Sequence, residues 1–159
     1  MTQEAIQDFY PDEVAVCYGC GRNNPNGLQI KTYWDGTEGL CRFKPQPHHT
    51  ALRGYVYGGL IASLIDCHSV GTAAAAVYEA EGRELGSDPP LRYVTGTLNV
   101  RYLRPTPINE ELLLRARIKE LHDKKVIVTC SLYAGDEECA QGEVIAIRAP
   151  KTMLTHAEE

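Results

Sequence analysis

The residues best suited to chemistry lie in one short segment, residues 54–66 (GYVYGGLIASLID). Within it, Gly58 and Gly59 open an apolar run typical of a helix, and Asp66 follows Gly59 by seven positions, about two helical turns. The first amides of a helix have no intrahelical acceptor and carry the positive end of the helix dipole, so they can stabilise an oxyanion. Glycine, which lacks a Cβ atom, lets a ligand approach that backbone closely. Asp66, on the same face, could remove a proton from a water molecule.

Both features also have purely structural interpretations. The glycine pair could serve close packing of the helix against a sheet, because the pair by itself is not specific to any ligand. Asp66 could be a buried carboxylate that accepts hydrogen bonds from backbone amides, since a carboxylate on an apolar helix is costly to bury without partners. Buried carboxylates also gather at functional sites, so we favour a functional role for Asp66.

The helix that would carry these residues extends over about residues 58–81. Nearly every position in 60–77 is apolar or small, which is typical of a helix buried on most of its faces. Asp66 and His68 interrupt the apolar run, and both would be costly in lipid. We therefore expect the buried core helix of a soluble protein and no membrane span.

Strand patterns lie on both sides of this helix. Before it, residues 29–33 and 39–43 are strand-like, and the turn between them at Asp35-Gly36 is a strong hairpin signal. After Leu91 apolar and polar residues alternate, which indicates four more strands. These strands include 98–102, 112–119, 126–132 and 144–148, with turn-like breaks at 105–109, 122–125 and 134–138. Short turns between successive strands imply an antiparallel sheet.

The fold class that follows is α+β, with an antiparallel sheet wrapped around one long central helix. A doubly wound fold is excluded because only one helix is available for crossovers. The length of 159 residues is that of one domain. We expect a lead-in at 1–16 that is helical up to Pro11, a single domain at 17–150 and a tail at 151–159.

The composition narrows the classes of partner. Sixteen basic and 21 acidic residues give a net charge of −5, so we expect no nucleic-acid partner. The first ten residues have neither the basic nor the apolar region of a secretory signal. Six cysteines without a secretory context favour free thiols in a cytoplasmic protein.

The spacing of Cys17 and Cys20, C-x-x-C, is that of half a zinc site. The sequence offers no second C-x-x-C pair to complete it, so we expect no metal. Free cysteines inside apolar patterned segments behave as small hydrophobic residues. Three cysteines are assigned to the core on this ground: Cys67, Cys130 and Cys139.

The order of motifs along the chain resembles that of one known family. The motifs are CYGCG at 17–21, NNPNGL at 23–28, the Gly-Gly helix with its aspartate, and TGTLNVRYLRP at 95–105. Over about residues 17–146 they are similar to those of the hotdog-fold acyl-CoA thioesterases of the phenylacetate-degradation type. The resemblance implies the hotdog fold, in which the sheet wraps around the central helix. It also implies a homodimer, often a dimer of dimers, with active sites at the subunit interface.

The resemblance assigns catalytic roles as well. The catalytic carboxylate of the family falls on Asp66, which would act as general base on water or as nucleophile on the thioester carbonyl. The oxyanion donors fall on the backbone of Gly58 and Gly59. The hydroxyl that orients the water falls on Thr95, which would come from the partner subunit.

Substrate-binding roles follow in the same way. Arg101 and Arg104 flank the strand end where such proteins hold the phosphates of coenzyme A, which a planar guanidinium suits; plain solvent exposure is the alternative. Tyr57 stands where the family usually has a histidine before the two glycines. His49 and Thr50 stand where the family has His-Gln in the loop that positions the thioester carbonyl. The departures at Tyr57 and Thr50 bear on the choice of substrate.

The expected function is hydrolysis of an acyl-CoA to the free acid and coenzyme A, with no cofactor because coenzyme A is part of the substrate. The alternative is a non-catalytic acyl-CoA-binding protein, which the departures at Tyr57 and Thr50 favour. An enoyl-thioester hydratase on the same fold would pair the carboxylate with a histidine on the helix. His68 lies two positions after Asp66 and therefore on a different helical face, which argues against a hydratase.

Overall fold

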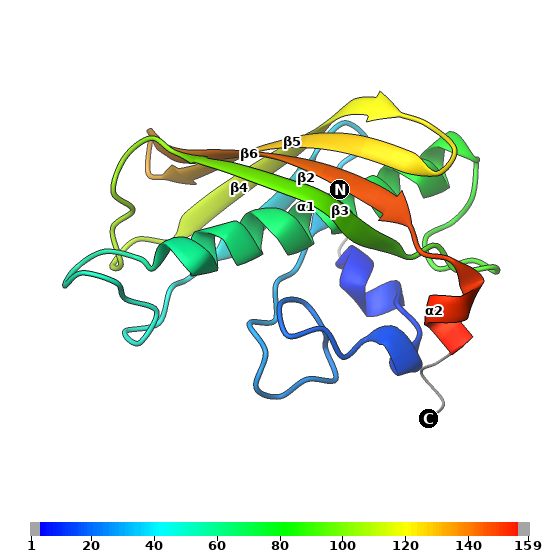
Figure 1. Cartoon of the computed structure of the whole chain (residues 1–159), viewed down its shortest axis with the longest axis horizontal. Coiled ribbons are helices and arrows are strands. Elements are labelled where there is room, and N and C mark those ends of the chain that lie inside the picture. The colour runs from blue at the N-terminus through cyan, green and yellow to red at the C-terminus, as the bar shows by residue number, and fades with distance from the viewer. Residues whose placement is uncertain (1–3, 156–159) are drawn as a thin grey trace.

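The computed structural model describes residues 4–155 and shows an antiparallel sheet curved around one long helix, α1, Gly58–Ala80 (Figure 1). The strands are β1 (Tyr33–Trp34), β2 (Gly39–Phe43), β3 (Tyr93–Tyr102), β4 (Leu112–Leu121), β5 (Lys125–Ala134) and β6 (Glu137–Arg148). They lie in the order β1-β2-β4-β5-β6-β3, so β1 and β3 form the two edges. The predicted α+β class and hotdog arrangement are confirmed.

Helix α1 is buried along most of its length because it is apolar on nearly all sides. Every residue from His68 to Tyr78 is buried. By length and composition α1 could cross a membrane, but 78% of its most apolar window is buried within the protein, as in a core helix. The sheet covers one side of α1, and the N-terminal segments lie on the other side (Figure 1).

The inner face of the sheet supplies the rest of the core. In the central strands every second side chain is fully buried beneath α1: Leu112, Leu114, Ala116, Val126, Val128 and Leu132. One glycine sets how closely the helix approaches the sheet, because a Cβ atom on Gly142 of β6 would lie 2.4 Å from Cγ2 of Ile65. A larger residue at position 142 would push α1 away from β6.

The lead-in forms two short 3-10 helices, η1 (Ile6–Phe9) and η2 (Asp12–Val14). Pro11 separates them as predicted, but a second helical turn follows it. The side chains of Ile6, Gln7 and Tyr10 are buried. The lead-in therefore packs into the same core as the rest of the domain.

A continuous chain of hydrogen bonds ties the lead-in to α1 and to β2. The side-chain nitrogen Nε2 of Gln7 donates to Oγ1 of Thr32 (3.1 Å), and the Thr32 hydroxyl donates to Nδ1 of His68 (2.9 Å). Nε2 of His68 then donates to the carbonyl of Gly39 (3.0 Å). This pattern assigns a neutral imidazole that carries its proton on Nε2. Complete burial lowers the pKa of His68 to about 4.

The strand predicted at 29–33 is wrong for most of its length, because β1 begins only at Tyr33. The preceding backbone amides have other acceptors: Ile30 donates to the carbonyl of Gly19 (3.0 Å), and Thr32 donates to the side chain of Gln7 (2.8 Å). Because these amides donate to the C-x-x-C loop and to the lead-in, they are not available for the hydrogen bonds of a β-strand.

The last strand is longer than predicted. The sequence indicates 144–148, whereas β6 starts at Glu137 and pairs with both β5 and β3. Acidic residues and a glycine hide the alternation in its first half. After β6 follows the short helix α2 (Lys151–Thr155), the last element of the described residues. Residues 1–3 of the predicted lead-in and 156–159 of the predicted tail lie outside the described residues.

Candidate active site

The N-terminal end of α1 presents two backbone amides, those of Gly58 and Gly59. The carbonyl of Tyr57 accepts the amides of Leu60 (3.1 Å) and Ile61 (3.3 Å). Within residues 4–155, no acceptor is hydrogen-bonded to the amides of Gly58 and Gly59. The positive end of the helix dipole lies at the same place. Both predicted oxyanion donors are therefore available.

Two tyrosines frame these amides. A Cβ atom on Gly59 would lie 2.3 Å from Cε1 of Tyr57, so a larger residue at position 59 would displace that ring. From the end of β3, the hydroxyl of Tyr102 donates to the carbonyl of Gly58 (2.7 Å). Tyr57 is 57% exposed, so its ring lies against the helix start and is still accessible.

A cleft of about 420 Å³ opens at this end of α1. Its lining includes Gly59 and three residues predicted to bind substrate, Tyr57, His49 and Thr50. The ring of His49 accepts the amide of Gln46 at Nδ1 (3.0 Å), and its carbonyl accepts the amide of Tyr57 (2.9 Å). Burial, with a smaller contribution from the neighbouring histidine, lowers the pKa of His49. His49 thus joins the preceding loop to the helix start and presents Nε2–H.

Asp66 lies two turns along α1 from Gly59 and contacts β3. The hydroxyl of Thr95 donates to Oδ1 of Asp66 at 2.5 Å. Burial raises the pKa of Asp66, the hydrogen bond from Thr95 opposes that rise, and Cys17 adds to it. A half-buried carboxylate with a raised pKa is a stronger proton acceptor than a carboxylate in water.

The Thr95 hydroxyl reaches Asp66 of its own chain, whereas the resemblance implied that it comes from the partner subunit. A register shift between Thr95 and Thr97 marks a bulge in β3. Without it, Thr95 would share the face of Thr97 and Asn99, away from α1, because alternate residues of a strand face opposite sides. The bulge turns Thr95 toward the helix, so one chain supplies both groups.

His68 does not face this site. It is fully buried, and its two ring nitrogens are hydrogen-bonded to Thr32 and to the carbonyl of Gly39. The predicted absence of a pairing between Asp66 and His68 is confirmed. The helix therefore lacks the carboxylate–histidine pair that would favour a hydratase.

The two arginines predicted to bind phosphate lie in different places. Arg101 lines a shallow cleft on the outer face of the sheet, with Asn99 and Gln141. Its neighbour Tyr102 points to the opposite face, toward α1, so the structure does not bring Arg101 to the cleft at the helix start. Arg104 lies just beyond the end of β3, is exposed, and pairs with Glu137 (3.5 Å).

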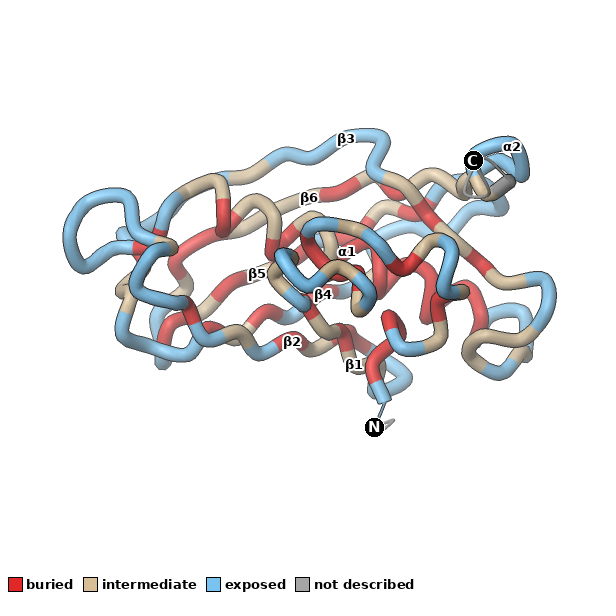
Figure 2. Tube along the Cα trace, turned by 90° about the horizontal axis from the view of Figure 1, so that it is seen from below, coloured by how far each residue is buried: buried red, intermediate tan, exposed pale blue. Residues whose placement is uncertain are grey.

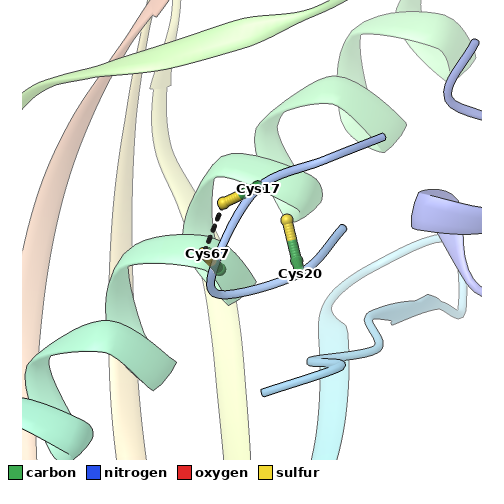
Figure 3. Close-up of side chains that lie close together, drawn as sticks. All are labelled: Cys17, Cys20 and Cys67. Carbon is green, nitrogen blue, oxygen red and sulfur yellow. Dashed lines mark hydrogen bonds between the residues drawn. The ribbon is translucent and has the colours of Figure 1, made fainter. Parts of the chain in front are cut away.

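A third cysteine, missed by sequence reasoning, joins the C-x-x-C pair beside Asp66. The sulfurs of Cys17, Cys20 and Cys67 lie within 4.8 Å of one another (Figure 3). Cys67 is partly buried and packs against the core, and its sulfur also lies against the loop. A Cβ atom on Gly19 would lie 2.3 Å from that sulfur. We call Cys17, Cys20 and Cys67 the cysteine triad; Cys130 and Cys139 are buried as predicted.

Hydrogen bonds within the cysteine triad favour a single thiolate. Contacts from Cys20 and Cys67, followed by the backbone amides of Cys20 and Gly19, hold the pKa of Cys17 far below its usual range. The contact with Cys17 raises the pKa of Cys20 to about 11 and also raises the pKa of Cys67. Negative charge in the triad therefore concentrates on Cys17, on the side of Asp66.

Similarity to known proteins covers the same part of the chain. The model of the thioesterase superfamily matches residues 53–141, which contain the start of α1, Asp66 and Thr95. A crystal structure of a thioesterase superfamily protein from Shewanella loihica PV-4 is 45% identical in sequence. That match covers 76% of this chain and 91% of the other, with a TM-score of 0.63.

Two further relatives are more distant. Acyl-coenzyme A thioesterase THEM4 of Xenopus laevis is 27% identical over 108 residues, which are 68% of this chain and 43% of that protein. The chain thus spans less than half the length of the curated relatives it matches. The PaaI protein from the phenylacetic acid degradation operon of E. coli shares the fold, with a TM-score of 0.63 at 14% identity over 77% of this chain and 81% of that one.

Proposed function

The chain belongs to the thioesterase superfamily, and from this membership we propose that it hydrolyses the thioester bond of an acyl-coenzyme A. The observation that carries the proposal is the contact between Asp66 and the Thr95 hydroxyl. Asp66 lies on the helix whose first two amides have no acceptor among the described residues. A proton acceptor and a pair of oxyanion donors are the groups that attack by water on a carbonyl requires. The curated relative named for acyl-coenzyme A thioesterase activity supports the substrate class.

In this proposal Asp66 removes a proton from water while the water oxygen forms a bond to the thioester carbonyl carbon. Negative charge develops on the carbonyl oxygen and is stabilised by the amides of Gly58 and Gly59. The C–S bond then breaks, and the proton held by Asp66 passes to the leaving thiolate. Water and thioester become acid and thiol, and the reaction needs no cofactor.

The hydroxyl of Thr95 has a positioning role. It donates to one carboxylate oxygen of Asp66 and leaves the other oxygen free to accept a proton. The same hydrogen bond lowers the pKa of Asp66 and keeps the carboxyl ionised over a wider pH range. Asp66 can also act as a nucleophile on the carbonyl, and incorporation of labelled water oxygen into the protein during a single turnover would distinguish that route.

The acyl and pantetheine parts of the substrate would occupy the cleft at the start of α1, beside Tyr57 and His49. Arg104 is the better placed of the two predicted phosphate ligands. It lies beyond the end of β3, and Tyr102 in that strand contacts Gly58. Its ion pair with Glu137 is exposed and therefore weak enough for a phosphate to replace the carboxylate.

We also propose that the protein is a homodimer that pairs through β3. This strand is a sheet edge and is exposed along most of its length (Figure 2). Apolar side chains are exposed on it and next to it, among them Leu98, Tyr102 and Leu103. An unpaired edge with apolar side chains is a surface that a second strand can cover.

The test is release of thiol from a panel of short aliphatic, long aliphatic and aryl acyl-CoAs. Asp66→Asn keeps the shape of the side chain and removes its basicity, so kcat should fall by about 10²- to 10⁴-fold. Asp136→Asn, the same change in an exposed turn, is the matched control and should hydrolyse at the wild-type rate. Undiminished turnover by Asp66→Asn would exclude Asp66 as the base.

A non-catalytic acyl-CoA-binding protein is the second candidate, and the ring of Tyr57 against Gly59 at the helix start favours it. In that case no member of the panel would release thiol, while titration with an acyl-CoA would still show binding. Tyr57→His would then restore the residue usual in the family, and a gain of hydrolysis would identify Tyr57 as the cause.

A further inference from the structure

The cysteine triad combines two segments that are distant in sequence. Cys17 and Cys20 come from the loop before β1, and Cys67 comes from α1 (Figure 3). The sulfurs of Cys17 and Cys67 are 3.9 Å apart, and all three lie within 4.8 Å. Zn–S bonds of about 2.3 Å place the sulfurs of a zinc site about 3.8 Å apart. A shift on the order of 1 Å in the third sulfur would complete that geometry.

Backbone hydrogen bonds hold the loop that carries Cys17 and Cys20 in one conformation. The amide of Gly21 donates to the carbonyl of Cys17 (2.8 Å), and the amide of Leu28 donates to that of Tyr18 (2.9 Å). The amide of Ile30 donates to the carbonyl of Gly19 (3.0 Å). The two cysteines of the loop are therefore held beside Cys67 by the backbone itself.

The charge around the triad also fits a divalent cation. Arg92 is half-buried, and its guanidinium lies 4.4 Å from the ring centre of Tyr10. No carboxylate in the described part of the chain forms an ion pair with it, and its largest electrostatic interactions are with Tyr10 and the three cysteines. Three thiolates and one divalent cation leave a single negative charge, which Arg92 would neutralise. A partly buried guanidinium is stabilised by a nearby anion, and the metal-bound triad would supply one.

We propose that the cysteine triad binds one zinc ion through three thiolates and so fastens the C-x-x-C loop to α1 next to Asp66. Zinc is the abundant cation that prefers thiolate ligands in tetrahedral sites, and a water molecule can serve as its fourth ligand. The role is structural: Cys67 follows Asp66 directly in α1, so the ion would hold the loop against the turn of helix that carries the carboxylate. The proposal does not depend on thioester hydrolysis.

The first measurement is the metal content of the full chain, purified with a non-histidine tag, in reducing buffer without chelator. Elemental analysis should find one zinc per chain in the wild type and a loss of most of it in Cys67→Ala. Cys139→Ala is the matched control, because Cys139 is a buried cysteine of the core outside the triad. It should retain the wild-type zinc content.

A second measurement does not require the variant to fold. Titration of the metal-free wild type with Co²⁺ should give the thiolate-to-cobalt charge-transfer band and the intense visible bands of a tetrahedral site, and zinc should abolish both. Hydrogen exchange in residues 17–28 should speed up when the metal is removed, while the β4–β5 hairpin stays unchanged.

Two results would overturn the proposal. One is a wild type that holds no more zinc than Cys67→Ala and gives no cobalt spectrum. The other is a wild type that forms a disulfide within the triad in the absence of added reductant, seen as a mass lower by two hydrogens, and that binds no metal after reduction. Two of the cysteines would then act as a redox pair. Loss of thioester hydrolysis alone affects neither measurement.

Discussion

At the scale of single residues, the chemistry of Asp66 depends on opposing effects. Burial raises the pKa of its carboxyl, and the hydrogen bond from Thr95 lowers it. A base must be ionised to accept a proton, so activity should rise with pH through this pKa and be lost below it. In the proposed mechanism, the hydrogen bond from Thr95 therefore sets how far activity extends toward acid pH.

Replacement of Thr95 by valine keeps the branched shape and removes the hydroxyl. The pKa of Asp66 should then rise further, so the acid limb of the kcat/KM profile should move to higher pH. Thr97→Val, the same change on the opposite face of β3, should leave the profile in place. An unshifted acid limb in Thr95→Val would show that the hydroxyl does not control the base.

Arg104 gives a second prediction at this scale. If its guanidinium binds a phosphate of coenzyme A, Arg104→Ala should raise KM for an acyl-CoA about 10-fold, since a charge-assisted hydrogen bond contributes about 1.5 kcal/mol. The same variant should hydrolyse an N-acetylcysteamine thioester, which has no phosphate, as well as the wild type does. Arg101→Ala is the comparison, because Arg101 lies on the outer face of the sheet. An equal loss of hydrolysis on both substrates would show that Arg104 supports the fold and does not bind a phosphate.

At the scale of elements, α1 is held at its centre by a buried polar chain. His68 links Thr32, and through it the lead-in, to the carbonyl of Gly39. Every link in this series of hydrogen bonds pairs a donor with an acceptor, and buried polar groups are tolerated in a core when they are paired in this way. The series requires a neutral imidazole, because both the Thr32 hydroxyl proton and the Nε2 proton are already in use.

That requirement makes stability depend on pH. The pKa of His68 falls from 6.5 to about 4 on folding, so the unfolded chain binds the proton first as pH decreases. The contribution of His68 is complete above pH 6.5 and is lost as pH falls toward 4. Between about pH 7.5 and pH 5 the free energy of unfolding should decrease by about 2 kcal/mol from this group.

Urea unfolding at the two pH values tests this dependence. In His68→Gln the decrease should be smaller by that amount, whereas His122→Gln, at an exposed histidine, should behave as the wild type does. Equal pH dependence in wild type and His68→Gln would show that the imidazole is not held neutral.

At the scale of the whole molecule, the edge strand β3 carries both the contact of Thr95 with Asp66 and the surface proposed for dimerisation. Leu98 of β3 is 39% exposed, and Leu121 at the end of β4 is 43% exposed. Leu98→Lys should convert the dimer to monomer in sedimentation measurements, because a charge would be buried at the interface. Leu121→Lys, equal in exposure and chemistry, should leave the dimer intact. A wild type that sediments as a monomer would contradict the proposed dimer interface.

Much of this architecture is determined by the sequence itself. A helix with apolar residues on all sides, as in 58–80, is stable only when it is buried. Alternating apolar and polar residues, as in β4 and β5, fit a sheet with one covered face. Local periodicity therefore determined the central helix, the antiparallel sheet and the position of Asp66 on the face of the two glycines.

Other features depended on tertiary structure, because they arise where segments distant in sequence meet. The bulge at Gly96 reverses the facing of Thr95, and strand periodicity alone places that hydroxyl on the wrong side. The sequence around Cys67 indicates only a core residue of an apolar helix, whereas the structure shows the loop of Cys17 and Cys20 packed on it. Periodicity acts over a few residues, whereas such contacts join positions 50 apart, and only the packed chain brings them together.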